Sequence, residues 1–212
     1  MRNFIFKIIK LVFLFLLPFI VLIRGAVYLH ENYRLYAWFS LLGGMLMSAA
    51  ILFLYFVFIQ GSMTGKTGSL KRKSWLAFTL VAAYCFPSVL YLSAANAKHP
   101  EVKKEFSSLH PILRLGIGTI IFLDNDLVLT DAERQPEDYK KMGLKTKKHS
   151  LHYIQKDGYA HAVDIRVNGR SAVRNWLLKL YFKSMGFNTL RHVGTGDHLH
   201  VSLRSRDRPG GI

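Results

Sequence analysis

Cysteine and acidic residues are both scarce in this sequence. The one cysteine, Cys85, stands within an apolar run, and a single cysteine excludes an intrachain disulfide. The chain has 13 acidic residues against 29 Lys and Arg, a formal net charge of +16. Such a basic surface favours anionic neighbours, namely phospholipid headgroups, wall polymers or nucleic acid. Charge of either sign is scarcest over residues 1–97, where 9 basic residues and 1 acidic residue give +8; the other 20 basic and 12 acidic residues also give +8.

Three long apolar runs occupy this charge-poor part of the chain. They extend over residues 4–23, 36–60 and 75–95, and the second contains no charged residue. Each is long enough to cross a hydrocarbon core of about 30 Å. The first run has the basic start of a signal peptide, but the segment 24–28 lacks a small-residue cleavage site, so we favour an uncleaved helix. Helices this long and this poor in charge are typical of membrane spans rather than of a soluble bundle. The three runs therefore predict a lipid bilayer as a partner.

The basic residues of the short loops predict how the spans are oriented. The loop 61–74 carries four basic residues and no acidic one, and the N-terminal segment carries three basic residues. The positive-inside rule places both in the cytoplasm. Three crossings then bring the C-terminal part outside, and cleavage of the first run would leave that placement unchanged. We therefore predict a multi-pass protein of the cytoplasmic (inner) membrane with a periplasmic or extracytoplasmic C-terminal domain, a compartment that disfavours nucleic acid as a partner.

The rest of the chain predicts an α+β domain with a small, mostly antiparallel sheet. We divide the chain into an α-helical membrane domain of three transmembrane helices (1–97), a juxtamembrane linker (98–113), a globular domain (114–204) and a polar tail (205–212). Alternating or β-branched apolar residues predict strands at 117–123, 127–130, 160–167, 187–192 and 198–203. Helices are expected over 135–142 and between Ser171, as N-cap, and Gly186, as the residue that ends the helix.

A pattern of histidine and aspartate in the C-terminal half predicts a metal site. His198 and His200 are two residues apart on a predicted strand, so both point to one face. Asp164 falls on another predicted strand, and His152 precedes it. Two imidazoles and one carboxylate are ligands of a catalytic zinc ion, with a fourth position left open for water. Asp197 stands three residues before His200, from where its carboxylate could take a proton from that water.

The motifs that contain these residues resemble those of a known family. Ser150-x-His152 is followed by Ala162-x-Asp164 and then by Asp197-x-x-His200. The upstream segment 129–137 is similar to the family's Ser-Gly-Tyr-Arg-(Ser/Thr)-Pro-Glu signature. Through residues 129–200 the chain resembles the zinc D-alanyl-D-alanine carboxypeptidase/endopeptidase family, which is grouped with lysostaphin-type peptidases and the hedgehog signalling domain.

The resemblance implies a role for each matching residue. Eleven residues separate His152 from Asp164, where the family usually has six, so we expect a longer hairpin between these two ligands. The implied roles are Zn2+ binding by His152, Asp164 and His200, general-base catalysis by Asp197, stabilisation of the substrate carbonyl and oxyanion by Arg134, and support of the substrate or intermediate by His198.

Three hypotheses for the function follow. The leading one is a membrane-anchored zinc metallopeptidase that hydrolyses peptidoglycan stem peptides, as a D,D-carboxypeptidase or an endopeptidase. The alternative is a non-catalytic, zinc-stabilised module that binds cell-wall peptides or a partner protein. In the third, the membrane helices act as a pore or scaffold, and the scarcity of charge within the spans argues against transport.

Other basic residues near the predicted site have plainer interpretations. We expect His161 to face solvent on the strand face opposite Asp164, or to be a substitute ligand if the longer hairpin has reorganised the site, and His192 to be a strand residue without a further role. The lysine run 140–148 is expected to be a solvated loop, with attraction to an anionic peptide, wall or membrane surface as its functional alternative.

Overall fold

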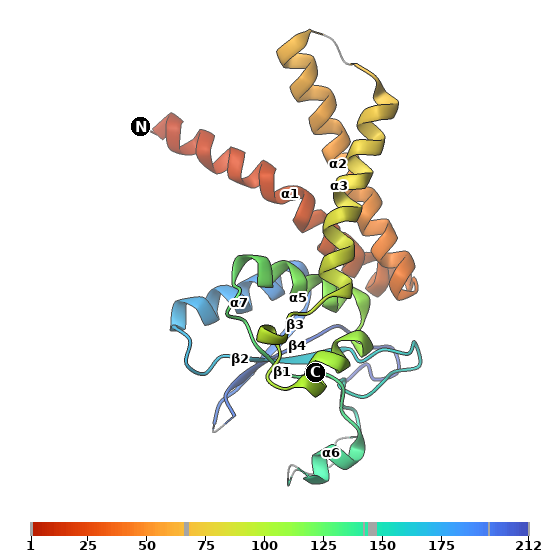
Figure 1. Ribbon diagram of the computed structural model, residues 1–212, viewed down its shortest axis with the longest axis vertical. Coiled ribbons are helices and arrows are strands. Elements are labelled where there is room, and N and C mark those ends of the chain that lie inside the picture. Colours follow the sequence, from red (N-terminus) through yellow and green to blue (C-terminus); the bar gives the residue numbers. More distant parts are fainter. Residues whose placement is uncertain (1, 66–67, 142, 144–147, 195, 212) are drawn as a thin grey trace. The chain divides into compact units, whose positions relative to one another are not determined.

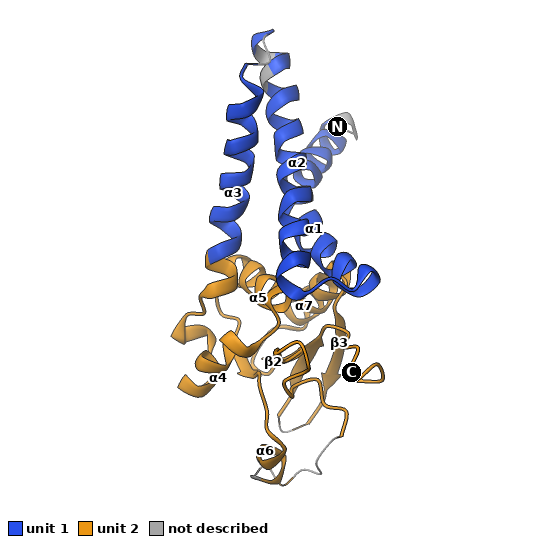
Figure 2. Cartoon of the chain, turned by 90° about the vertical axis from the view of Figure 1, so that its right-hand side faces the viewer, with its two compact units in different colours: residues 1–86 blue, residues 87–212 orange. Residues whose placement is uncertain are grey.

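The chain folds into two compact units, residues 1–86 and 87–212 (Figure 2). The computed structural model describes residues 2–65, 68–141, 143, 148–194 and 196–211. Lys66, Lys145, Lys147 and residue 195, between the last two predicted strands, lie outside the described residues. The predicted fold class is confirmed: three long apolar helices precede a C-terminal region with a small antiparallel sheet and several helices (Figure 1).

The N-terminal helices are α1 (Arg2–Tyr33), α2 (Ala37–Thr64) and α3 (Leu70–Leu90). All three are long and apolar enough to cross a membrane, over Phe4–Tyr33, Ala37–Ile59 and Leu70–Leu90. The last turn of α3 belongs to the second unit, because that unit begins at Pro87. The predicted membrane spans are therefore present as helices.

Helices α1 and α2 pack closely at small residues. A Cβ atom on Gly44 would lie 2.3 Å from the backbone oxygen of Leu22, so only glycine fits at this crossing. Pro18 has no N–H, which deprives the Leu14 carbonyl of its helical hydrogen bond. The Tyr55 hydroxyl donates to that carbonyl across 2.9 Å and replaces the missing bond. Such replacement matters in a membrane span, where no water is at hand to satisfy a carbonyl.

The second unit is built on a four-stranded sheet in the order β1-β2-β4-β3, with every neighbouring pair antiparallel. Helices α5 and α7 lie over one face of this sheet (Figure 1). The elements are η1 (Ala94–Asn96), α4 (Pro100–Glu105), η2 (Phe106–Ser108), α5 (Pro111–Leu123), β1 (Leu129–Asp131), α6 (Pro136–Lys141), β2 (Ala162–Arg166), α7 (Ala172–Met185), β3 (Asn188–His192) and β4 (His198–Ser202).

The alternation of side chains along β2 and β4 separates the core from the polar cluster. Val163 pairs with Val201 and Ile165 with Leu199, and all four side chains are at most 2% exposed. The intervening residues point to the opposite face. Asp164, His198 and His200 therefore share the face that does not carry these apolar residues.

The predicted strand at 117–123 is wrong, because these residues form the second half of α5. The helix begins at Pro111, the first helical position, where the missing N–H costs no hydrogen bond. The His110 side chain caps it by accepting a hydrogen bond from Ile112 N. Isoleucine and threonine favour strands only weakly, and burial of nearly the whole helix outweighs that preference. The predicted hairpin between 117–123 and 127–130 is therefore absent, and Leu129–Asp131 pairs with β2 instead.

Gly118 gives a testable consequence of this packing. A Cβ atom there would lie 2.4 Å from the backbone oxygen and 2.8 Å from the Cα atom of Ser88, in the last turn of α3. Gly118→Ala should destabilise the second unit by about 1–3 kcal/mol, as overpacking does, despite alanine's helix advantage of about 1 kcal/mol. Thermal unfolding of the full chain measures this. Gly210→Ala is the control, because nothing lies within 4 Å of that position, and equal melting temperatures for the two variants would contradict the packing argument.

The predicted limits of α7 are confirmed. The Ser171 hydroxyl accepts a hydrogen bond from Arg174 N, and Gly186 follows the helix with a φ of 99°, a left-handed conformation suited to glycine. Leu178, Phe182 and Met185 form its buried side. Val173, Leu177 and Leu180 lie on its exposed side.

Candidate metal centre

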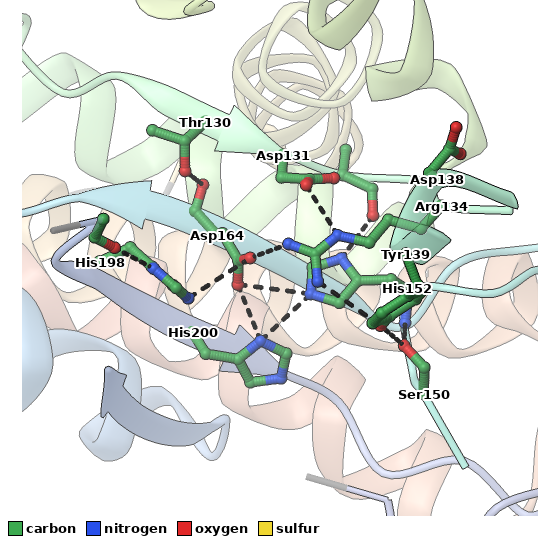
Figure 3. Close-up of polar contacts among 12 residues, drawn as sticks. Thr130, Asp131, Arg134, Asp138, Tyr139, Ser150, His152, Asp164, His198 and His200 are labelled. Atoms are coloured by element: carbon green, nitrogen blue, oxygen red, sulfur yellow. Dashed lines mark hydrogen bonds and ion pairs between the residues drawn. The ribbon is translucent and has the colours of Figure 1, made fainter. Parts of the chain in front are cut away.

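Two neighbouring strands bring Asp164 and His200 together. Asp164 of β2 stands directly opposite His200 of β4 in the antiparallel register. His200 Nδ1 lies 2.8 Å from Asp164 Oδ1. The two residues are only 2% and 5% exposed. The sheet therefore fixes one carboxylate oxygen beside one imidazole nitrogen in a buried position (Figure 3).

His152 reaches the same point from the segment that precedes β2. Its backbone oxygen accepts a hydrogen bond from Arg134 N at 3.0 Å, and its Nδ1 lies 2.6 Å from the Ala132 carbonyl oxygen. Because a carbonyl only accepts, Nδ1 carries the proton and Nε2 presents its lone pair. Metal-binding histidines in proteins have this same arrangement, with the second ring nitrogen donating to a carbonyl.

The three ligand atoms form a compact triangle. His152 Nε2 lies 3.2 Å from His200 Nδ1 and 3.3 Å from Asp164 Oδ1, and the third edge is the 2.8 Å contact between His200 and Asp164. Ligands at 2.0–2.2 Å from a tetrahedral ion are about 3.3–3.6 Å apart. His152, Asp164 and His200 could therefore hold a metal ion with little movement. The sequence predicted these three residues.

The extra residues between His152 and Asp164 form a tight hairpin. Ile154 and Ala160 form an antiparallel bridge, Gln155 N donates to the Tyr159 oxygen at 2.9 Å, and Gly158 N donates to the Gln155 oxygen. Gly158 has a φ of 85°, which glycine adopts without strain. The additional length therefore projects as a loop, and the two ligands stay in contact at its base.

Arg134 lies on the other side of the Asp164 carboxylate. Its Nη2 donates to Asp164 Oδ2 at 2.5 Å and its Nε to Asp131 Oδ2 at 2.7 Å. Tyr139 accepts a longer bond from Nη1 at 3.5 Å. Asp164 thus presents Oδ1 to the two histidines and Oδ2 to a guanidinium group. The structure places Arg134 next to the cluster, as its position in the motif predicted.

The cluster's pKa shifts favour the protonation states that bind metal. Burial alone would raise the pKa of Asp164, but its contacts with His152 and His200 outweigh burial and hold that pKa well below its usual value. Burial lowers the pKa of His200 by more than its contact with Asp164 raises it. An ionised carboxylate and a neutral imidazole are the ligand forms of these groups.

The depressed pKa of Asp164 predicts acid sensitivity in the metal-free protein. Because the folded-state pKa lies below the unfolded-state value of about 3.9, this carboxylate stabilises the fold fully above that value. That stability is lost as the pH falls through the folded-state pKa. The unfolding temperature of chelator-treated protein should fall more steeply between about pH 5 and pH 2 than that of Asp164→Asn. Parallel pH profiles for the two proteins would contradict the shift.

His198 and Asp197 lie at the edge of the cluster. His198 Nε2 is 3.5 Å from Asp164 Oδ2, with a quarter of its side chain exposed. The Asp197 carboxylate accepts two hydrogen bonds from Arg191, at 3.1 and 2.7 Å. The bonds from Arg191 lower the pKa of Asp197, although burial opposes this shift. The general-base role of Asp197 stays a prediction, since its carboxylate engages Arg191 here. His192, predicted to have no further role, packs against the His198 ring with centroids 4.8 Å apart.

The prediction that His161 faces solvent is wrong, since this residue is 2% exposed. Its Nε2 lies 2.8 Å from Asp157 Oδ2 and its Nδ1 lies 3.2 Å from the Arg204 carbonyl oxygen. His110 is also buried, and these two histidines and Asp157 form a second group whose ligand atoms lie within 4.8 Å of one another. Sequence reasoning missed this group because His110 is far from the other two members in the sequence. The one local signal was the spacing of four residues between Asp157 and His161.

Comparison with known proteins gives no match: no family model, no curated protein and no solved structure is similar to this chain. The functional argument therefore rests on the geometry and chemistry of the chain's own residues. Lys140 and Lys148 of the lysine run are exposed. Lys140 lies in α6 rather than in a loop, whereas Lys148 lies outside the helices and strands.

Proposed function

We propose that this chain is a membrane-anchored zinc peptidase that hydrolyses peptidoglycan stem peptides, as a D,D-carboxypeptidase or an endopeptidase. The observation that carries the proposal is the buried triangle of His152 Nε2, Asp164 Oδ1 and His200 Nδ1 with Arg134 beside it. Structural zinc sites use four protein ligands, whereas catalytic sites use three and leave one position open. Three nitrogen and oxygen ligands fit the second class.

The ligand types support zinc as the ion. Two imidazoles and one carboxylate suit zinc better than they suit calcium or magnesium, which prefer oxygen ligands. When bound, zinc supplies a Lewis acid that polarises a carbonyl group and promotes the ionisation of water. The protein's contribution is to hold the three donor atoms in place, through the Ala132 carbonyl for His152 and through the β2–β4 pairing for the other two.

Arg134 would stabilise the negative charge that develops on the substrate oxygen. Its contacts with Asp131, Asp164 and Tyr139 use three of the five N–H groups of the guanidinium. Burial lowers the pKa of Arg134, but the carboxylates of Asp164 and Asp131 raise it by more, so the group stays charged. A fixed cation beside the scissile carbonyl stabilises the transition state for amide hydrolysis. His198, partly exposed and directed to Asp164 Oδ2, would contact the substrate or the intermediate.

The membrane helices would hold this site outside the cytoplasmic membrane, where cell-wall peptides are found. The distribution of basic residues supports this orientation, since the loop between the second and third spans and the N-terminal segment are both basic. Anchoring by the membrane helices also limits diffusion to the membrane surface. The proposed substrate and the proposed compartment thus agree.

A non-catalytic zinc module that binds cell-wall peptides or a partner protein is the second candidate. The observation that favours it is the paired bond from Arg191 to Asp197, because this bond engages the carboxylate that would act as general base. In this alternative, the same three ligands hold zinc for stability. Asp197 then only links β4 to β3.

Asp197→Asn distinguishes the two candidates. For a peptidase, removal of the general base should lower the rate of muropeptide hydrolysis by about 10²–10⁴-fold, while the zinc content stays at the wild-type level because the ligands are untouched. Mass spectrometry of digested muropeptides measures the rate, and elemental analysis measures the zinc. Wild-type protein that contains zinc, binds wall peptides and cleaves none would support the binding module and refute the peptidase.

A further inference from the structure

We infer that the second unit binds a second metal ion, held by His110, Asp157 and His161. The Nε2 atoms of the two histidines approach the same carboxylate oxygen, Asp157 Oδ2, at 3.9 Å and 2.8 Å. The imidazole side chains are 0% and 3% exposed, and the Asp157 side chain is 23% exposed. Two imidazoles and one carboxylate are the same set of donors as in the first cluster.

The geometry of this group closely matches that of the first. The His110 and His161 rings have centroids 4.9 Å apart at 63°, and the His152 and His200 rings have centroids 5.0 Å apart at 59°. In each group one histidine donates through Nδ1 to a backbone carbonyl, Arg204 O for His161. That bond keeps one proton of His161 on Nδ1, so that Nε2, which contacts Asp157 Oδ2 at 2.8 Å, would present its lone pair to an ion bound between these two atoms. The two groups thus share their ring arrangement and donor types, and they differ in that His200 presents Nδ1 whereas His110 and His161 both present Nε2.

Binding at the second group requires a specific tautomer of His110. Ile112 N donates to His110 Nδ1 across 3.3 Å, a long hydrogen bond. Coordination through Nε2 puts the proton on Nδ1, so metal binding replaces this bond with a metal–nitrogen bond. A metal–nitrogen bond is much stronger than a helix-capping hydrogen bond of this length. Metal binding should therefore also remove the His110 cap from the N-terminus of α5.

The second ion would hold in place the hairpin between His152 and Asp164, two ligands of the first ion. Asp157 belongs to this hairpin, and its Oδ1 accepts a hydrogen bond from Tyr159 N. His110 caps α5 and His161 directly precedes β2. One ion would therefore connect the hairpin, a helix and the central strand. The site suits zinc or a similar transition-metal ion, since imidazole nitrogen is a preferred ligand of these ions.

Metal stoichiometry tests the inference. Full-length protein in detergent is equilibrated with Zn2+, freed of excess and analysed for zinc, and the fold of each variant is checked by circular dichroism. We expect two equivalents of zinc per chain in the wild type and one in Asp157→Asn. The double variant Asp157→Asn with Asp164→Asn should contain none. Asp207→Asn is the control: Asp207 accepts a hydrogen bond from Lys156 N in the same hairpin and is outside the group.

A wild type with one equivalent that persists in Asp157→Asn and disappears in Asp164→Asn would overturn the second site and leave the first intact. The group would then be a hydrogen-bonded triad without metal. Loss of all zinc from each single variant, Asp157→Asn and Asp164→Asn, would also overturn the second site, because the two substitutions would then act on one shared site or on the whole fold. As a direct test, Asp157→Cys loaded with Co2+ should show a sulfur-to-cobalt charge-transfer band, which is absent from the wild type because Cys85 lies in α3. Absence of this band in a folded variant would count against the site.

Apolar side chains also form an exposed stripe on α7. We propose that this α7 stripe lies in the membrane interface. Val173, Trp176, Leu177 and Leu180 are 66%, 60%, 51% and 47% exposed. Their spacing places them on one stripe of the helix, opposite the buried Leu178, Phe182 and Met185. A stripe of this kind, with tryptophan in it and lysines beside it, is typical of helices that lie in a membrane interface.

The bilayer is the occupant because this surface is connected to the end of a membrane span. Gly118 of α5 packs against Ser88 in the last turn of α3, and Tyr181 of α7 donates to Gly116 O of α5 at 2.8 Å. At the C-terminal end of α5, Phe122 and Leu123 are also exposed, at 70% and 73%. Lys179 and Lys183 border the α7 stripe and would meet anionic headgroups.

Quenching of Trp176 by brominated lipids tests this surface. The chain has three tryptophans, so Trp38→Phe and Trp75→Phe leave Trp176 as the one fluorophore. In nanodiscs, lipid brominated near the glycerol end should quench most of its emission relative to unbrominated lipid. In the control, Trp176→Phe with Val193→Trp moves the fluorophore to the exposed β3–β4 loop, where emission should be unchanged. Unquenched Trp176 would overturn the proposal, and so would concentration-dependent crosslinking of Leu177→Cys, which would assign the stripe to a second copy of the chain.

Discussion

Asp164→Asn is expected to remove the ion from the first cluster and to abolish hydrolysis of cell-wall peptides. Asp164 Oδ1 is a corner of the ligand triangle, 2.8 Å from His200 Nδ1 and 3.3 Å from His152 Nε2. Loss of an outer hydrogen-bond partner of a ligand costs about 10–100-fold in metal affinity, and loss of the ligand itself should cost more. Hydrolysis should fall to background, because the ion supplies the activation of both carbonyl and water.

The size of asparagine makes this test specific. The substitution keeps the volume and one oxygen, so the strand pairing of β2 with β4 should persist, which circular dichroism would verify. The variant also leaves Arg134 with Asp131 as its remaining carboxylate. Muropeptide digestion and zinc analysis on the same sample measure the two effects together. Wild-type activity in a variant that has lost its zinc would contradict the assignment of these ligands.

Arg134→Ala is expected to lower both stability and activity. Removal of the guanidinium leaves the 3% exposed side chain of Asp164 without its cationic partner. Breaking such a buried pair costs about 3–5 kcal/mol. Loss of a group that stabilises the developing oxyanion costs about 10²–10³-fold in kcat. Denaturant unfolding and muropeptide hydrolysis measure the two effects separately.

Two further variants show which property of Arg134 matters. Arg134→Lys keeps the charge, but its single nitrogen cannot reproduce the planar group that bridges Asp131 and Asp164. We expect intermediate stability and activity that is still reduced. Arg191→Ala serves as the stability control, since Arg191 makes an exposed pair with Asp197 and exposed pairs contribute little. A loss of stability in Arg191→Ala as large as in Arg134→Ala would refute the argument from burial.

The strands that carry Asp164 and His200 could be predicted because strand periodicity is local information. One residue separates His198 from His200, and alternation alone places both on one face. The direct pairing of Asp164 with His200 depends on register, which the sequence leaves open. The helix limits at Ser171 and Gly186 were likewise predictable from local capping chemistry.

The second half of α5 and the position of His152 could not be predicted, for different physical reasons. Isoleucines at 117, 120 and 121 suit a strand by propensity, and only the burial of residues 111–120 by the rest of the unit selects the helix. His152 is held by the Ala132 carbonyl and by Arg134 N, contacts between residues about 20 apart in sequence. In the group of His110, Asp157 and His161, the approach of His110 to the local pair Asp157 and His161 is likewise a tertiary contact.

Anomalous diffraction at the zinc edge tests the central claim most directly. The account predicts that crystals of the full chain grown with Zn2+ show an anomalous peak bonded to His152 Nε2, Asp164 Oδ1 and His200 Nδ1, at about 2.0–2.2 Å from each. This peak should be absent from crystals of Asp164→Asn. A map from zinc-saturated wild-type crystals with no peak among these three atoms would contradict the account.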